Sequence, residues 1–204
     1  MLQQYARMHD EGERFLGVPA AKTFPGKSLF AQVGRIGVLV KDSGATNLLD
    51  YGCGKGLQYA ARDIDVPGVG QVESVQDYWE VDFVWRFDPA FRPLSAEPKG
   101  VFGGVICTDV LEHVPEEDLD WVLGDLFGYA SRFVFASVAC YPASKRLPDG
   151  GNAHCTLLPP TRWRDAFRAA ASVKPGIRWQ LVAEERLAQG GASRRVEHVF
   201  DSTD

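Results

Sequence analysis

The chain has 204 residues, 45% of them hydrophobic and 24% charged, which suits one globular domain with a real core and leaves no room for a second. Its formal net charge of −5 provides no broad basic surface, so we expect no long nucleic acid as a partner. No apolar run approaches the roughly 20 residues that span a bilayer, so we expect no membrane contact either.

Two further features favour a cytoplasmic protein. The first residues, Met1-Leu2-Gln3-Gln4-Tyr5, lack the basic segment and apolar segment of a secretion signal. The cysteines stand singly, without a C-x-x-C pair, so reduced thiols are expected. Nothing in the composition specifies an oligomeric state.

Residues 1–45 predict a helical cap ahead of the core, which would span residues 46–204 of the same domain. A weak helical pattern covers residues 1–16. A clearer one begins after Ser28, which can cap it, runs to Gly44, which can end it, and should pack on the sheet. Three side chains of the first segment either pack on the body of the protein or face a substrate: Tyr5, His9 and Phe15.

A strand that runs directly into a glycine-rich turn is the central feature of the sequence. Asn47–Asp50 reads as a short buried strand, and Gly52–Gly56 then places glycine at every second position. Glycine permits positive φ and removes Cβ atoms, so a ligand can approach the backbone. The dinucleotide fingerprint requires a third glycine where Leu57 stands, which argues against a nicotinamide-dependent dehydrogenase. A helix is predicted from Leu57 to about Asp63.

The next expected strand, residues 81–88, ends in Asp88 and is followed by Pro89. A carboxylate at this position can accept hydrogen bonds from both ribose hydroxyls of a nucleotide-like ligand. The alternative is a solvated loop aspartate.

Another strand, residues 104–107, runs into the segment Thr108–Pro115, which reads T-D-V-L-E-H-V-P. Pro115 can open a helix that continues with acidic residues and then an apolar stripe to Phe127. The remaining predicted elements are a strand over 132–138, a loop over 141–160, a helix over 161–171, and strands over 179–184 and 195–200 separated by Gln189-Gly190-Gly191.

Together, D-x-G-x-G-x-G and D-V-L-E-H-V resemble two motifs of class I S-adenosylmethionine-dependent methyltransferases. The resemblance covers about residues 46–140 and implies a Rossmann-like α/β three-layer sandwich, mostly parallel, with a C-terminal antiparallel hairpin. The stretch between Asp88 and residue 104 is too short for the family's third strand, which should therefore be missing. The usual adenine contact then has only weak candidates in Ser95 and Glu97. The implied cofactor is S-adenosylmethionine, and by position its site comprises Asp50, Tyr51, Gly52, Cys53, Gly54, Gly56, Asp88, Pro89, Thr108 and Asp109.

Asp109, Glu112 and His113 stand at i, i+3 and i+4, which on a helical turn would put them on one face. This D-x-x-E-H set is similar to the E-x-x-E-H metal pattern of ubiquinone-biosynthesis O-methyltransferases and small-RNA 3′-terminal 2′-O-methyltransferases. In the small-RNA family, a later loop supplies another histidine. The resemblance implies Mg²⁺ or Mn²⁺ bound by Asp109, Glu112, His113 and His154, lowering the pKa of an acceptor hydroxyl. In the metal-free alternative, His154 or His113 is the general base.

The expected activity is O-methylation of a small polar molecule such as a sugar, a nucleotide or a hydroxylated metabolite, with His154, His113 and Asp109 as the candidate catalytic residues. Two alternatives remain open, another S-adenosylmethionine-using transferase and a non-catalytic cofactor-binding module. Several residues of the long loop either face the acceptor or form a solvated surface: Tyr141, Lys145, Arg146, Asn152 and His154.

Overall fold

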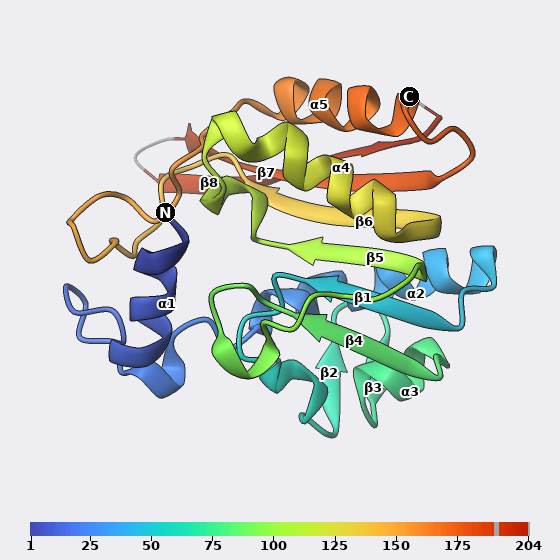
Figure 1. The fold of residues 1–204 in the computed structure, drawn as a ribbon, viewed down its shortest axis with the longest axis horizontal. Helices are drawn as coiled ribbons and strands as arrows, with labels where there is room; N and C mark the ends of the chain where they lie inside the picture. The colour runs from blue at the N-terminus through green and yellow to red at the C-terminus, as the bar shows by residue number, and fades with distance from the viewer. Residues whose placement is uncertain (190–191, 204) are drawn as a thin grey trace.

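A six-stranded sheet with helices on both faces forms the body of the protein (Figure 1). The computed structural model describes residues 1–189 and 192–203, so Gly190 and Gly191 of the predicted hairpin turn lie outside the described residues. The elements are α1 (Leu2–Glu11), α2 (Val33–Ser43), β1 (Asn47–Tyr51), β2 (Ile64–Val66), β3 (Gly70–Val72), α3 (Val75–Trp79), β4 (Phe83–Phe87), β5 (Phe102–Thr108), α4 (Leu119–Tyr129), β6 (Ala130–Ala139), α5 (Pro160–Ser172), β7 (Arg178–Gln189) and β8 (Ala192–Asp201).

The sheet has the order β4-β1-β5-β6-β7-β8, and neighbouring strands run parallel except for the last pair, β7 and β8. The predicted α/β class, the mostly parallel sheet and the C-terminal antiparallel hairpin are therefore confirmed. Between β4 and β5 the chain forms only a 3₁₀ turn, Arg92–Leu94, and β4 is the edge of the sheet. The predicted absence of a further strand in this fully described stretch is also confirmed.

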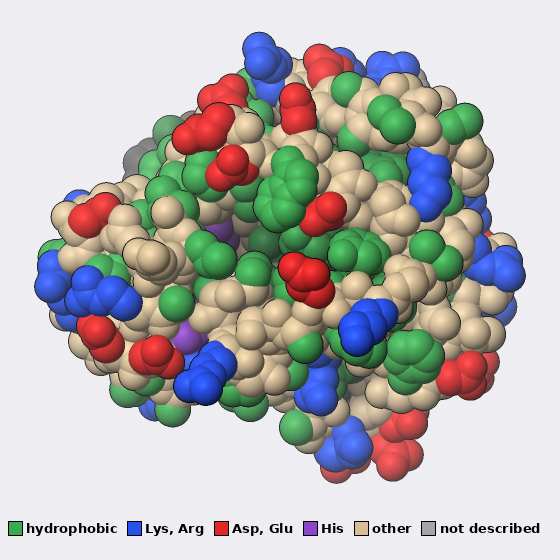
Figure 2. All heavy atoms as spheres, viewed as in Figure 1, with side chains coloured by type: hydrophobic (Ala, Val, Ile, Leu, Met, Phe, Trp, Pro, Cys, Tyr) green, Lys and Arg blue, Asp and Glu red, His purple; other side chains and the backbone are tan. Residues whose placement is uncertain are grey.

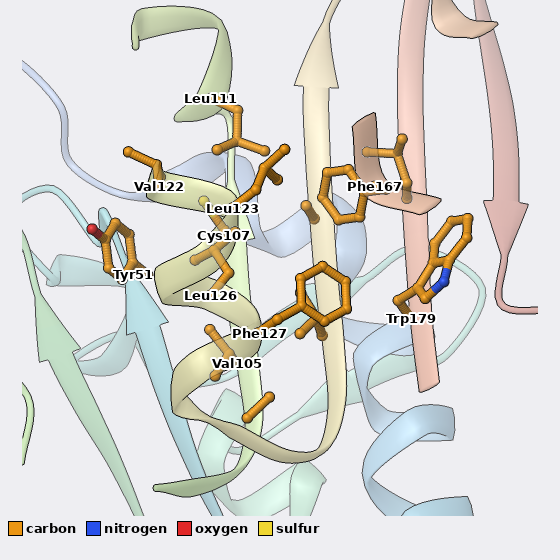
Figure 3. Close-up of a cluster of buried hydrophobic side chains, with 14 of the residues drawn as sticks. Tyr51, Val105, Cys107, Leu111, Val122, Leu123, Leu126, Phe127, Phe167 and Trp179 are labelled. Carbon is orange, nitrogen blue, oxygen red and sulfur yellow. The ribbon is translucent and has the colours of Figure 1, made fainter. Parts of the chain in front are cut away.

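The sheet is buried on both faces because successive side chains of a strand point to opposite sides. On β1, Leu49 packs in the cluster under α4 and α5, whereas Leu48 packs in the cluster under α2. Figure 3 shows the first cluster, in which Leu126 and Phe127 of α4 lie over Val105 of β5. Burial on two sides explains why these strands read as continuous apolar runs.

The N-terminal region differs from its prediction. α1 ends at Glu11, earlier than predicted, because Gly12 takes a φ of 88°. Ser28 does not cap a helix, since Lys27–Gln32 forms a 3₁₀ turn ahead of α2. Gly44, with a φ of 63°, ends α2 as predicted.

The predicted helix after the glycine turn is wrong. Only Leu57–Tyr59 is helical, as one short 3₁₀ turn, and the chain continues into the β2–β3 hairpin and the short helix α3. Asp63 has a φ of 51°, which a right-handed helix cannot contain. Ser74 caps α3, its hydroxyl accepting from the N–H of Asp77 at 3.1 Å.

α1 lies at the end of the sheet toward which the arrows of the central strands point in Figure 1. Met8 of this helix packs with Leu147 and Ala153 of the loop between β6 and α5. Open parallel sheets bind ligands at the carboxyl ends of their strands. α1 and this loop therefore stand where a ligand is expected.

Among the described residues, no helix has both the length and the apolar character needed to cross a membrane.

Candidate functional site

The glycine turn after β1 is left-handed and bonded to the neighbouring strand. Gly52, Gly54 and Gly56 have φ of 81°, 60° and 66°. The N–H of Gly54 donates to Asp88 Oδ2 at 2.8 Å, and the N–H of Gly52 donates to the Phe87 carbonyl at 2.7 Å. The carboxyl ends of β1 and β4 are thus joined into one edge.

Close packing within the chain requires two of these glycines. A Cβ atom on Gly52 would lie 2.4 Å from Val110 Cγ2, and one on Gly54 would lie 2.4 Å from the Phe24 carbonyl oxygen. The same carbonyl accepts from the N–H of Lys55 at 2.9 Å. Part of the turn is therefore covered by the N-terminal segment rather than open to a ligand.

Asp50 is buried beneath the turn, with 1% of its surface exposed. Its Oδ2 accepts from the Tyr59 hydroxyl at 2.8 Å and from Gln58 Nε2 at 3.0 Å, while Oδ1 has no hydrogen-bond partner among the described residues. Burial raises the pKa of this carboxyl to about 7, although both hydrogen bonds act to lower it. A buried acceptor without a partner is costly unless a proton or a ligand satisfies it.

Asp88 lies just past the end of β4, buried and already bonded to the backbone. Besides the bond from Gly54, its Oδ1 accepts from the N–H of Ala90 at 2.9 Å. Each carboxylate oxygen retains a second acceptor position, so two ligand hydroxyls could bind in addition. Burial raises the pKa of Asp88 to about 6, against the lowering effect of the backbone bonds.

His9 of α1 covers Asp88. Its ring stacks on Phe91 with centroids 5.0 Å apart, and its Nε2 lies 3.9 Å from Asp88 Oδ1. Lys55 Nζ, which can only donate, lies 3.2 Å from His9 Nδ1, so Nδ1 accepts and Nε2 carries the proton. Burial and then the Lys55 charge lower the pKa of His9 to about 4, so the ring is neutral at pH 7. The neutral ring therefore lies beside the Asp88 carboxylate, to which a ligand hydroxyl would bind.

Of the three N-terminal candidates, Tyr5 also reaches the site. Its hydroxyl donates to the Ala153 carbonyl at 2.6 Å, and its ring lies edge to face with His113 at 5.3 Å. Phe15 does not reach the site, because it follows the end of α1 and is 48% exposed.

Other predicted cofactor residues have packing roles. Tyr51 lies under α4, where its hydroxyl donates to Asp125 Oδ2 at 3.3 Å (Figure 3). Cys53 is buried, which raises the pKa of its thiol. Thr108 is buried at the end of β5, whereas Pro89 is exposed.

Asp109 follows β5 with a φ of 54°, uncommon for a residue with a side chain. The Ser137 hydroxyl donates to its Oδ1 at 3.2 Å. Asp109 is an exposed residue, although protein atoms crowd its carboxyl group. This desolvation raises the pKa of Asp109, and the Ser137 bond and the charges of Arg195 and Lys145 oppose the rise, as His154 does when it is protonated. Strained, accessible carboxylates of this kind are typical of functional sites.

Asp109, Glu112 and His113 do not share one helical face, so that prediction is wrong. The left-handed backbone at Asp109 interrupts the helical path, and only Leu111–His113 forms a 3₁₀ turn. Glu112 is fully buried: its Oε1 accepts from the N–H of Ala139 at 2.9 Å, and its Oε2 has no partner among the described residues. Burial, reinforced by Asp109, raises the pKa of Glu112 well above its usual value and favours the neutral acid.

Two imidazoles meet beside Asp109, with the ring centroids of His113 and His154 4.9 Å apart. Nδ1 of His113 lies 2.7 Å from the Ala153 carbonyl, and Nδ1 of His154 lies 2.6 Å from the Tyr141 carbonyl. Because carbonyl oxygens only accept, each Nδ1 carries a proton and each Nε2 keeps a lone pair. Burial lowers the pKa of both rings, that of His113 to about 3, so both are neutral at pH 7.

The predicted Mg²⁺ or Mn²⁺ site does not fit this arrangement. In the part of the chain that the structure describes, no three side chains among His, Cys, Asp and Glu are placed to hold a metal ion. His113 and His154 lie side by side near Asp109, whereas Glu112 points into the protein and accepts from the N–H of Ala139 at the end of β6.

Hydrophobic side chains line a hollow over the carboxyl ends of the central strands, with acidic side chains at its border (Figure 2). The two adenine candidates lie on the loop after β4. The hydroxyl of Ser95 donates to the carbonyl of Arg92 at 3.1 Å, and Glu97 is exposed. Neither is fixed toward this hollow by a contact with the site.

Several residues at this edge have no signal in the sequence. Gln58 and Tyr59 bind Asp50 from a segment that reads as helix, and Glu184 of β7 accepts from the hydroxyl of Tyr141 across the loop. Such contacts depend on how distant segments meet, and no local pattern encodes them.

Comparison with protein-family models, with curated proteins and with solved structures gives no match.

Proposed function

We propose that the chain is an S-adenosylmethionine-dependent methyltransferase that methylates a hydroxyl oxygen of a small polar acceptor. The observation that carries this proposal is the joined edge of β1 and β4, where a left-handed glycine turn donates its Gly54 N–H to Asp88. An acid at the end of each of these strands, with glycines between them, is the arrangement that the sequence resemblance implies.

The groups at this edge fit the polar parts of the cofactor in type. Asp88 has acceptor positions left for two ribose hydroxyls, and Asp50 Oδ1 is a buried acceptor without a partner among the described residues. When bound, S-adenosylmethionine supplies a methyl group on a sulfonium, an electrophile that needs no further activation.

The chain's own task is to orient the acceptor and to remove its proton. Asp109 and the Nε2 lone pair of His154 stand at the end of β5, the strand next to β1. In this proposal His154 Nε2 takes the hydroxyl proton, and the carboxylate of Asp109 stabilises the imidazolium that forms. His113 is too weakly basic for this role and holds the loop before α5 through Ala153.

One observation favours the non-catalytic alternative. The Phe24 carbonyl already occupies one side of the glycine turn, and His9 covers Asp88. A protein that has lost its cofactor would fill the turn with its own chain in this way. The two possibilities differ in whether the N-terminal segment yields to the ligand.

Isothermal titration with S-adenosylhomocysteine tests the proposal. Wild-type protein should bind in the micromolar range. Asp88→Asn should bind at least tenfold more weakly, a loss of about 1.4 kcal/mol, because the amide cannot accept at both atoms. Asp82→Asn, an exposed residue just before β4, is the matched control and should bind like wild type. No binding by wild type, or equal binding by Asp88→Asn, would refute the assignment.

A further inference from the structure

We propose that the acceptor carries an anionic group, a carboxylate or a phosphate, which Lys145 and Arg186 bind beside Asp109 and His154. The inference rests on the proposed function, since it names the class of molecule that the site would methylate.

Lys145 and Arg186 have no carboxylate partner among the residues that the structure describes. Arg186 lies over the ring of Tyr141, its Cζ 4.0 Å from the centroid, and Lys145 Nζ lies 5.2 Å from the centroid of Phe24. Neither takes part in an ion pair with any residue that the structure describes. Aromatic faces hold both side chains in place and leave their N–H groups for another partner.

Both cations are close to the groups proposed to do the chemistry. The Tyr141 ring that carries Arg186 lies 6.2 Å from the His154 ring, centroid to centroid, and the carbonyl of Lys145 accepts from the N–H of Ala153, the residue before His154, at 3.2 Å. Both charges accordingly act to lower the pKa of His154. The two come from different parts of the chain, the loop after β6 and strand β7. Their convergence on one point therefore results from the fold and not from a basic run in the sequence.

The hairpin adds a third cation, Arg195, next to Arg186. Arg186 of β7 stands directly opposite Arg195 of β8, and like charges in this position repel one another. Arg195 is neutralised by an ion pair with Glu184, which also accepts from the Tyr141 hydroxyl. The guanidinium of Arg186 is left uncompensated, and a bound anion would remove the repulsion.

This local excess of positive charge occurs in a chain whose net charge is −5. An acceptor that presents its hydroxyl to His154 and its anionic group to Arg186 would satisfy both ends of the site. A guanidinium can bind carboxylate or phosphate with two parallel hydrogen bonds, and the ammonium of Lys145 adds a point charge. An uncharged sugar or alcohol would leave both cations unpaired.

Titration of the full chain with inorganic phosphate and, separately, with acetate tests the inference and distinguishes the two anions. We expect saturable binding of at least one of them that weakens as salt rises. Lys145→Gln/Arg186→Gln should bind that anion at least tenfold more weakly. Lys41→Gln/Lys99→Gln changes the net charge equally at exposed positions elsewhere and should bind it like wild type.

No saturable binding of either anion, or equal binding by the two double variants, would overturn the inference. S-adenosylhomocysteine binding is measured on the same proteins, and a variant that binds it like wild type is folded. The single variants Lys145→Gln and Arg186→Gln are measured in the same way, in case the double variant does not fold. Cofactor binding without anion binding would refute only the anionic acceptor. Anion binding without cofactor binding would refute the proposed function instead.

Discussion

Asp50 is a carboxyl group that the fold holds in surroundings unfavourable to its charge. It is almost fully buried, two donors bind one of its oxygens, and the other oxygen has no partner among the described residues. Burial outweighs the two hydrogen bonds, and the pKa rises to about 7. The folded protein therefore binds this proton more tightly than the unfolded chain does.

The sign of the pH effect follows from this difference. Between about pH 4 and pH 7 the folded state holds a proton that the unfolded state has released, so ionisation of Asp50 lowers stability as pH rises. Each tenfold difference in proton affinity corresponds to about 1.4 kcal/mol. Between pH 5 and pH 8 the free energy of unfolding of wild type should therefore fall relative to that of Asp50→Asn, by at least about 2 kcal/mol.

Urea unfolding at the two pH values measures this gain. Comparing the two proteins cancels the pH effects of the other buried groups. One of these is His113, whose lowered pKa makes stability rise with pH. Asp82→Asn, which changes an exposed carboxyl, should follow wild type at both pH values. Parallel pH profiles for wild type and Asp50→Asn would show that Asp50 keeps an ordinary pKa.

At the scale of elements, α1 closes the site through two side chains that lie one helical turn apart. Tyr5 donates to the Ala153 carbonyl in the loop before α5, and His9 packs on Phe91 beside Asp88. Its apolar contacts form a small cluster around Met8, separate from the two large clusters of the sheet. A helix held by so few contacts should open more easily than the sheet does.

Tyr5→Phe tests this by removing one hydroxyl. The lost hydrogen bond should weaken the docking of α1 by about 1 kcal/mol, because the Ala153 carbonyl still accepts from His113. Hydrogen exchange should become several-fold faster in α1 and stay unchanged in β5. Tyr78→Phe is the control, since the Tyr78 hydroxyl has no hydrogen-bond partner among the described residues, and it should leave α1 unaffected. Unchanged exchange in α1 would contradict this account of the helix.

Strands were easier to predict than turns, for a physical reason. The buried strands β1, β5 and β6 appear as apolar runs because both faces of the sheet are covered. The segment after the glycine turn contains residues that suit a helix, yet Asp63 takes a left-handed conformation and the chain turns into a hairpin. The same failure affects Asp109, whose positive φ breaks the helical turn on which the metal prediction depended.

At the scale of the whole molecule, the strand order brings candidate residues to one edge of the sheet, but it does not determine the direction in which their side chains point. Strand order places Asp50, Asp88 and Asp109 at one edge, and this could be predicted from three strand ends. The inward direction of Glu112, the cover provided by Phe24 and the position of Arg186 depend on packing between distant segments. Such features have no local signal in the sequence.

The most direct measurement is the movement of backbone amide signals when S-adenosylhomocysteine is added to ¹⁵N-labelled protein. We expect large shifts at Gly52, Gly54 and Gly56 together with residues of α1, because His9 of that helix lies beside Asp88. Gly124 and Gly128 of α4 serve as internal controls and should stay in place. Shifts confined to other parts of the chain, or no shifts at saturating ligand, would contradict the assignment of the glycine turn as a cofactor site.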